Sequence, residues 1–241
     1  MKKLLAGLFL ISSVIAFSNV QTFPYEKMVT HGTSNIVYIE GQEKPFTGIV
    51  EKKFPNGKIE ATMNFKNGKL HGKTVTYYQN GNMKSDENFI DGIAQGISKT
   101  FYENGQVEYE TNFKNSQREG IEKAYSKSGV LVSEVPFKND AATGLAKLYN
   151  EQTGKLEYET SAVNGQRNGL SKKYYPSGKL LSEVNFKNDK EEGMMKSYYE
   201  SGKLQGEIPY KNGQVEGVVK AYDENGKLIE QATFKNGEEV K

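Results

Sequence analysis

Polar and apolar residues alternate along most of the chain, and pairs such as Asn-Gly interrupt the alternation at regular intervals. In FYENGQVEYETNFKNSQREG, residues 101–120, Asn104-Gly105 separates two alternating runs, and a second turn signal follows before Gly120. A period of two is typical of a strand with one covered face, and Asn-Gly between two such runs indicates a hairpin. This stretch therefore predicts two antiparallel strands joined by a tight turn.

The same unit recurs, and a glycine precedes the first strand of each copy. The spacing is 24 residues, except for one interval of 25 whose extra residue lies in NEQTG, residues 150–154. The glycines are Gly48, Gly72, Gly96, Gly120, Gly144, Gly169, Gly193 and Gly217. Eight units run from about residue 47 to residue 241, each with two short turns. They predict an all-β fold: an elongated, single-layer antiparallel meander of tandem β-hairpins, twisted and open, with about sixteen strands.

Two-residue turns fix which residues face each other across each hairpin. We assume type I′ turns, in which both central residues have positive φ, as Asn-Gly tolerates. Tyr102 then lies opposite Val107, and Lys99 lies opposite Glu110. The same count predicts a ladder of ion pairs, in which Lys123 faces Glu134, Lys147 faces Glu159, Lys172 faces Glu183, and Lys196 faces Glu207. The ladder helps to fix the strand register, because a slip of one residue breaks every pair.

The two faces of the predicted sheet differ in composition. The better buried face carries the second aromatic residue of each first strand, such as Tyr102, the apolar residues that follow the turns, such as Val107, and the phenylalanines that end the second strands, such as Phe113. The glycine column lies on this face as packing space for neighbouring rings. The opposite face carries the ion-pair ladder and a further aromatic column.

This opposite face is the candidate binding surface. It comprises Tyr77, Phe101, Tyr125, Tyr149, Tyr174, Tyr198 and Tyr222, with Lys99, Lys123, Lys172 and Lys196. Two interpretations remain open. The aromatic rings pack against lysine stems from neighbouring strands, or they offer evenly spaced contacts to an extended partner.

The unit G-x-x-x-x-Y-Y-x-N-G-x-L-x-x-E-x-x-F-K-N-G resembles the variant MORN repeat of bacterial proteins over residues 47–241. The resemblance implies hairpins laid side by side in one extended, twisted sheet. It also implies a binding role, because other MORN repeats are linked to membrane lipids and to protein assembly, and bacterial members are often labelled antitoxin-like. The fifth unit departs from the pattern, since Ala162-Val163 replaces the Phe-Lys pair, and we expect less regular geometry there.

The N-terminal residues predict export. Residues 1–18, MKKLLAGLFLISSVIAFS, combine two lysines, an apolar run and small residues near Ser18, as a secretory signal peptide does. We therefore expect a location in the periplasm, on the cell surface or outside the cell. Residues 19–46 are an N-terminal segment in which residues 19–34 are irregular and residues 35–39 form a strand that caps the sheet. The charged residues 238–241 protect the other edge.

Composition excludes several function classes. The chain has 32 basic and 30 acidic residues, and the predicted signal peptide removes two lysines, so nucleic-acid binding is not expected. The only histidines are His31 and His71, and cysteine is absent. No cluster of metal ligands and no nucleophile with a neighbouring base is visible, so we expect no enzyme activity, no metal and no cofactor.

The remaining function class is a binding scaffold. We expect an exported, non-enzymatic protein that binds a protein partner or associates with itself through its aromatic-lined sheet. The alternative is a glycan, cell-wall or membrane-lipid binding module. An antitoxin-like role fits export poorly, since a toxin is usually neutralised where it acts. The sequence does not identify the partner.

Overall fold

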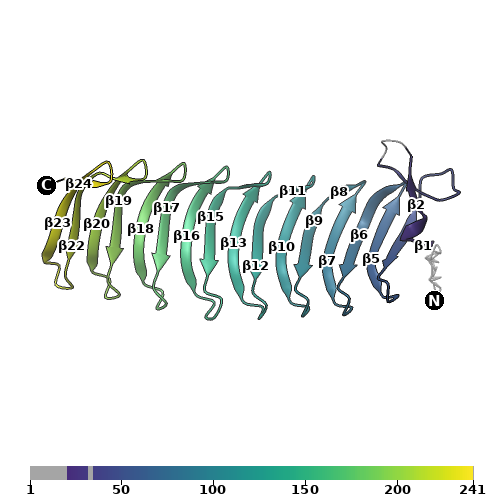
Figure 1. The fold of residues 1–241 in the computed structure, drawn as a ribbon, viewed down its shortest axis with the longest axis horizontal. Helices are drawn as coiled ribbons and strands as arrows, with labels where there is room; N and C mark the ends of the chain where they lie inside the picture. The colour runs from purple at the N-terminus through teal and green to yellow at the C-terminus, as the bar shows by residue number, and fades with distance from the viewer. Residues whose placement is uncertain (1–20, 32–34, 241) are drawn as a thin grey trace, which may run out of the picture.

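The computed structural model describes residues 21–31 and 35–240, and all statements about the structure refer to these residues. They form one long sheet of 22 strands, in which strands stand side by side across the long axis (Figure 1). The ends of the described chain lie at opposite ends of the sheet. The prediction of an open, elongated, single-layer meander of hairpins is confirmed.

Each repeat contributes two long strands. The first strands are β4 (Gly48–Lys53), β6 (Lys69–Tyr77), β9 (Gly96–Phe101), β12 (Gly120–Tyr125), β15 (Gly144–Tyr149), β17 (Gln166–Tyr174), β19 (Lys190–Tyr198) and β22 (Gly217–Tyr222). The second strands are β5 (Ile59–Lys66), β7 (Met83–Ile90), β10 (Val107–Lys114), β13 (Leu131–Lys138), β16 (Leu156–Val163), β18 (Leu180–Lys187), β20 (Leu204–Lys211) and β23 (Leu228–Lys235). Short strands precede four of the first strands: β8 (Ile93–Ala94), β11 (Gln117–Arg118), β14 (Ala141–Ala142) and β21 (Gln214–Val215).

The turns inside the repeats differ from the prediction. In the third repeat, the Tyr102 N–H donates to the Gln106 carbonyl and the Gly105 N–H donates to the Tyr102 carbonyl, both at 2.8 Å. Three residues therefore form the loop, and of these only Gly105 has a positive φ, of 88°. This geometry is a type I turn followed by a glycine bulge, so the predicted type I′ turn is wrong here.

The turns between repeats are the ones that have type I′ geometry. Asn67 and Gly68 both have positive φ, of 51° and 74°, and the flanking Lys66 and Lys69 pair directly. The later turns repeat this arrangement, and Asn or Asp stands at the first central position of each. The short side chains of Asn and Asp tolerate left-handed backbone better than other side chains do.

The three-residue loop changes the pairing beside it. Val107 lies opposite Phe101 rather than Tyr102, so the predicted face of Val107 and of the leucines equivalent to it is wrong. A bulge between Val107 and Tyr109 then restores the expected register, and Lys99 pairs with Glu110. The predicted pairings of Lys123, Lys147, Lys172 and Lys196 with glutamates are likewise confirmed.

The glycine that starts each repeat meets a backbone requirement rather than a need for space. All eight have positive φ, from 78° at Gly96 to 152° at Gly48. A Cβ atom added at Gly96 meets nothing within 4 Å, and among the eight only Gly48 has an aromatic ring, that of Phe46, within 4 Å of the added atom. The interpretation of the column as room for aromatic rings is therefore wrong at the other seven glycines. The glycine also lies at an irregularity in the pairing between repeats. From the Asn88–Gln95 hydrogen bond to the Asp86–Lys99 pair, β7 advances by two residues while the following strand advances by four, so that strand contains two extra residues near Gly96.

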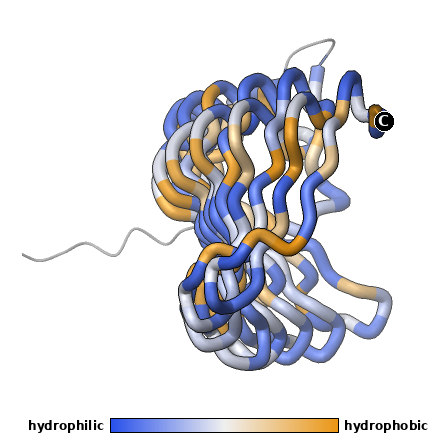
Figure 2. Tube along the Cα trace, turned by 90° about the vertical axis from the view of Figure 1, so that its left-hand side faces the viewer, coloured by the Kyte–Doolittle hydropathy of each residue, from blue (hydrophilic) through white to orange (hydrophobic). Residues whose placement is uncertain are grey.

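We name the two faces by the residues that mark them. The phenylalanine face carries Phe65, Phe89, Phe113, Phe137, Phe186 and Phe234, and the lysine face carries Lys99, Lys123, Lys147, Lys172 and Lys196. Small polar residues of the phenylalanine face are buried, with Ser171 2% exposed, whereas Ile97 of the lysine face is 58% exposed. Viewed along its long axis, the sheet has a bent cross-section (Figure 2). The burial indicates that the bend is concave on the phenylalanine face.

The N-terminal end of the sheet is closed by a segment expected to be irregular. The strand β1 (Thr22–Pro24) pairs in parallel with β4 and caps the edge. A 3-10 turn, η1 (Tyr25–Lys27), leads into β2 (Met28–Thr30), which pairs with β3 (Val37–Ile39) in a separate two-stranded sheet. The predicted strand at residues 35–39 therefore exists, but β1 caps the sheet in its place.

A cluster of buried hydrophobic residues lies at this end. It consists of Val37, Ile39, Phe46, Val50 and Phe65. The ring of Phe46 lies between Phe23 and Phe65, at centroid distances of 5.4 and 6.1 Å. Hydrophobic burial therefore concentrates where the N-terminal segment adds a second layer, as expected when a single sheet cannot cover itself.

The fifth repeat and the C-terminal edge are regular. In the fifth repeat Gly144 pairs with Ala162 and Lys147 with Glu159, so the expected irregularity is wrong. The extra residue is confined to the loop, where the Asn150 N–H donates to the Lys155 carbonyl at 2.8 Å. At the C-terminal end, β24 (Glu238–Val240) pairs with β23 and ends the sheet with an exposed, acidic strand.

Candidate functional site

Four of the seven aromatic residues in the column of the candidate binding surface donate hydrogen bonds to glutamates. The hydroxyl of Tyr149 donates to Glu134 at 2.7 Å, and that of Tyr174 donates to Glu159 at 2.7 Å. The next two repeats have the same contact, from Tyr198 to Glu183 at 2.8 Å and from Tyr222 to Glu207 at 3.0 Å. Each bond links one repeat to the preceding one, so these tyrosines hold the array together.

The lysines of the candidate surface form fewer ion pairs than predicted. Lys99 contacts Glu110 at 3.0 Å. Lys172 lies opposite both Glu159 of the preceding repeat and Glu183 of its own hairpin, and it contacts Glu159, at 3.7 Å. Within the described residues, no carboxylate lies within 4 Å of the Lys123 or Lys196 ammonium. The paired columns thus exist, but tyrosine hydroxyls are the closer partners of most of the glutamates.

Burial and the neighbouring carboxylates shift the ionisation of these tyrosines. The pKa of Tyr149, Tyr174 and Tyr198 is raised from 10 to about 12. Burial is the largest cause, and the hydrogen bond to glutamate is the second. Both causes oppose a phenolate, because it carries a negative charge and cannot donate to a carboxylate.

We expect the protein to lose stability between pH 10 and about 12. In that range an unfolded tyrosine releases its proton while the folded one keeps it, so the folded chain binds more protons and rising pH favours unfolding. Below pH 10 these tyrosines are protonated in both states, so their full contribution to the free energy of unfolding is present. Urea unfolding followed across this range measures the slope, and a variant with Tyr149, Tyr174 and Tyr198 all changed to Phe is the control. An equal slope in the variant would contradict the assignment.

A second tyrosine column joins four of the repeats to the following one, whereas Ser126 and Asn150 stand at its position in the fourth and fifth repeats. The hydroxyls of Tyr78, Tyr102, Tyr175 and Tyr199 donate to the carbonyl oxygens of Phe101, Tyr125, Tyr198 and Tyr222, at 2.7 to 2.9 Å. Each bond spans 23 residues of sequence. The rings of this column are consequently fixed at both ends, by the backbone of their own strand and by that of the next repeat.

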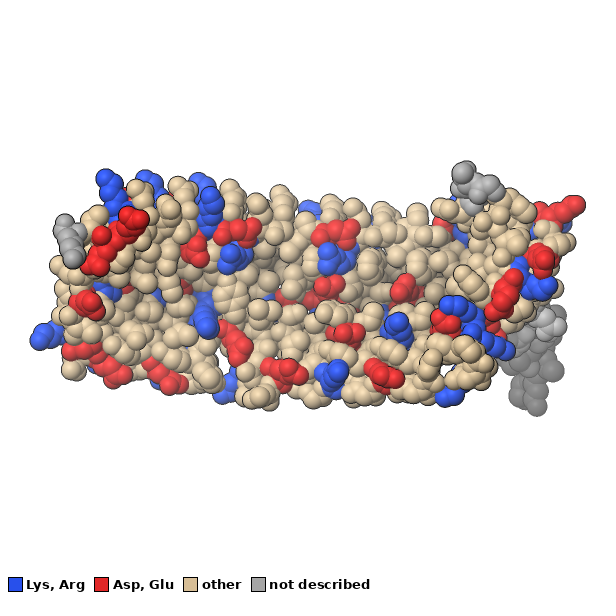
Figure 3. All heavy atoms as spheres, in the orientation of Figure 1, with Lys and Arg blue, Asp and Glu red and all other residues tan. Residues whose placement is uncertain are grey.

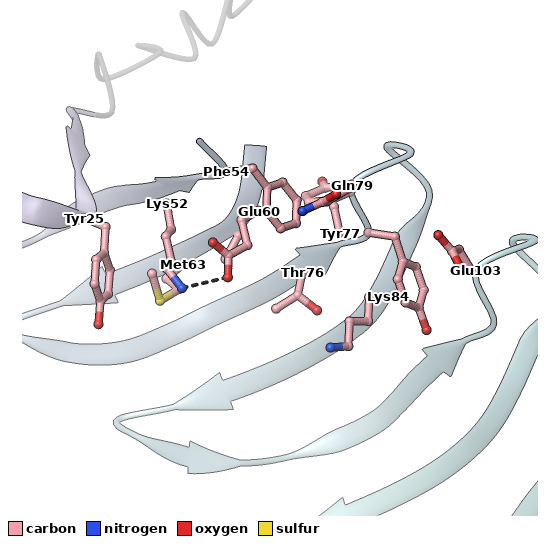
Figure 4. A pocket seen from close by; sticks show the side chains of 12 residues that line it. Tyr25, Lys52, Phe54, Glu60, Met63, Thr76, Tyr77, Gln79, Lys84 and Glu103 are labelled. Atoms are coloured by element: carbon pink, nitrogen blue, oxygen red, sulfur yellow. Dashed lines mark hydrogen bonds and ion pairs between the residues drawn. The ribbon is translucent and has the colours of Figure 1, made fainter. Parts of the chain in front are cut away.

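Hollows lie between these rings at the Asn-Gly end of the strands. The first, about 470 Å³, lies among Tyr25, Phe54, Tyr77, Tyr78 and Lys84, with the Lys52–Glu60 ion pair at its side (Figure 4). The second, about 570 Å³, lies among Tyr78, Tyr102, Glu103, Asn104 and Lys127. The third, about 510 Å³, has Tyr102, Tyr125, Lys127, Tyr149, Glu151 and Glu157 among its lining residues.

Neighbouring hollows share walls. Tyr78 and Glu103 line the first and second, and Tyr102 and Lys127 line the second and third. The three hollows therefore form one row across the first five repeats, which we call the tyrosine groove. Tyr77, Tyr125 and Tyr149 of the predicted binding surface line it, whereas Phe101, Tyr174, Tyr198 and Tyr222 line none of the three hollows.

Charge along the molecule is mixed. Acidic and basic side chains are interspersed on the face shown in Figure 3, and neither sign covers a large area. In the groove, the Lys84 and Lys127 ammonium groups lie 5.8 and 6.0 Å from the ring centroids of Tyr78 and Tyr102. Burial, followed by the negative charge of Glu108, raises the pKa of Tyr102.

Sequence reasoning missed two features that join the repeats. It placed Tyr78 and Tyr102 on the better buried face but did not predict their hydrogen bonds to the next repeat. Their recurrence 24 residues apart suggested a shared role. It also missed Arg118 and Arg167, whose guanidinium groups lie 3.9 and 4.0 Å from the ring centroids of Phe137 and Phe186. Each of these arginines also contacts an aspartate of the next turn, Asp140 or Asp189. The sequence did contain an indication of this contact, because these two units alone have an arginine two residues before the repeat glycine.

The described residues carry neither a cluster of metal ligands nor a helix that could span a membrane. No group of three or more histidine, aspartate or glutamate side chains is placed to hold a metal ion there. No helix in this part of the chain has the length and apolarity needed to cross a membrane.

Comparison with known proteins identifies the repeat. The family model described as "MORN repeat variant" matches residues 46–67, 70–91, 94–115, 118–139, 167–188, 191–212 and 215–236. These seven segments cover more than half of the chain. The fifth unit is the one without a match, in line with its altered sequence. A search of curated proteins found no match.

Proposed function

Because the chain belongs to the MORN repeat variant family, we propose that it is a non-enzymatic repeat scaffold, exported from the cell, that binds a protein partner along the tyrosine groove. The observation that carries the proposal is the row of three hollows with shared tyrosine walls. Aromatic side chains in preformed hollows are typical anchors of protein interfaces. The sequence of residues 1–18 supports export.

The hydrogen bonds of the groove favour recognition by a rigid surface. Tyr78 and Tyr102 cannot turn away from the hollows without losing their bonds to Phe101 and Tyr125. A partner therefore orders few side chains of the scaffold on binding, and this lowers the entropic cost of association.

A photo-reactive residue in place of Lys127 tests the proposal in producing cells. We expect it to cross-link a defined protein, since Lys127 lines two of the hollows. The matched control carries the same residue in place of Lys235, an exposed lysine of β23 far from the groove. Equal cross-linking at both positions, or cross-links to the chain itself alone, would contradict a protein partner in the groove.

A further inference from the structure

The tyrosine groove has a fixed pitch. One repeat spans two strands, and strands in a sheet lie about 4.7–4.9 Å apart, so equivalent residues such as Tyr78 and Tyr102 recur about every 9.5 Å. The hollows follow the same pitch, because Tyr78 and Tyr102 are the walls that they share. A partner that fills successive hollows in the same way needs a matching period along its own axis.

Regular protein conformations differ in whether they meet this condition. A polyproline II helix rises about 3.1 Å per residue with three residues per turn, so one turn advances about 9.3 Å and presents the same side chain again. An extended β-strand also advances about 10 Å in three residues, but alternate side chains point in opposite directions. Two turns of an α-helix advance about 10.8 Å, so an α-helix moves further out of step with the hollows at each repeat.

The chemistry of the walls matches the same partner. The Tyr78 and Tyr102 hydroxyls are bonded to backbone carbonyls. The Asn104 side chain donates to the Lys127 carbonyl at 2.8 Å and accepts from the Gln106 N–H at 3.1 Å. Because the polar groups of these side chains are bonded within the protein, the two tyrosine rings present their faces, and pyrrolidine rings can pack against them. Polyproline II segments commonly dock in aromatic-lined grooves.

Charge gives the partner a direction. The third hollow contains Glu151 and Glu157 beside a single lysine, Lys127. The first hollow contains Lys84 and Glu103 beside the paired Lys52 and Glu60, so its charges balance, whereas the third hollow has one negative charge in excess. A basic residue of the partner is therefore favoured at the end that lies over the fourth and fifth repeats.

We infer that the tyrosine groove binds a proline-rich protein segment in the polyproline II conformation, with one residue triplet per repeat and a basic residue at one end. This inference rests on the proposed function and names the class of partner.

Titration of the purified chain with a labelled peptide tests the inference. The peptide has about four Pro-Pro-X triplets and arginine at one end, and its control replaces the prolines with Gly and Ser at equal length and charge. We expect the proline peptide to bind at least about 10-fold more tightly, because its conformation is already ordered. Equal affinity for the two peptides would overturn the inference.

Variants locate the binding. Tyr102→Ala is expected to weaken the proline peptide at least about 10-fold, while Tyr102→Phe keeps the ring and stays within about 2-fold. Tyr199→Ala is the matched control, since it loses the same type of bond, to the Tyr222 carbonyl at 2.7 Å, but lines none of the three hollows. If Tyr199→Ala weakens binding as much as Tyr102→Ala, the inference is wrong.

Competition separates this inference from the proposed function. If the proline peptide, added before irradiation, prevents the cross-link at position 127, both stand. If a protein is cross-linked there and the peptide does not prevent it, the inference fails and the proposed function stands. If no protein is captured and cell-wall glycan fragments bind the purified chain through Tyr102, both fail.

Discussion

Replacing Phe46 by alanine is expected to lower the free energy of unfolding at the N-terminal end by about 3–5 kcal/mol, the range typical of buried phenylalanines. Phe46 is 2% exposed, and its ring contacts Phe23 and Phe65. Removing the ring leaves a cavity between the N-terminal segment and the sheet, which the neighbouring rings fill only in part.

The effect of this variant should be local. In a repeat array each unit contacts only its neighbours, so the loss does not spread evenly along the sheet. Amide hydrogen exchange should become faster in β4 and β5 and stay unchanged in β18 to β20. Ile97→Ala is the control, because a residue that is 58% exposed contributes within about 0.5 kcal/mol. Uniformly faster exchange would show that the array unfolds as one unit.

Alanine at Gly144 is expected to destabilise the protein by about 3 kcal/mol, from backbone strain combined with a clash. Gly144 has a φ of 124°, and an added Cβ atom would lie 2.9 Å from Cγ of Pro136. Neither the strand backbone nor the proline ring moves easily to make room.

Gly96 separates the two contributions. Its φ is 78°, and an added Cβ atom meets nothing within 4 Å. Gly96→Ala should therefore cost about 1–2 kcal/mol, from strain alone. Chemical denaturation of both variants measures the difference. If neither variant is destabilised, the glycine column is not a backbone requirement.

The comparison of prediction with structure is clearest at the hairpin of residues 101–113. The sequence predicted the pairing of Lys99 with Glu110 but not that of Val107 with Phe101. Asn-Gly is compatible with a two-residue loop and with a three-residue loop, and these differ by one residue in register. The bulge at Glu108 compensates for the longer loop, so residues beyond it lie where the shorter loop would have placed them.

The candidate site shows a similar division. Tyr77, Tyr125 and Tyr149 were selected from the sequence and line the groove. The sequence could not show that Tyr78 and Tyr102 are its shared walls, because their position depends on bonds to carbonyl oxygens of the next repeat. Whether each glutamate contacts a lysine or a tyrosine likewise depends on which side chain reaches its carboxylate in the folded sheet.

The sequence by itself determined the repeat, the order of the hairpins and, beyond the residues next to the loops, which residues share a face of the sheet. These follow from a 24-residue period, alternation and turn-forming residues, all of which act between neighbours in the chain. Only the tertiary structure decided the loop length, the bend of the sheet, the parallel strand β1 at its edge and the groove. These depend on contacts between residues distant in sequence, or on small energy differences between backbone conformations that the same residues allow.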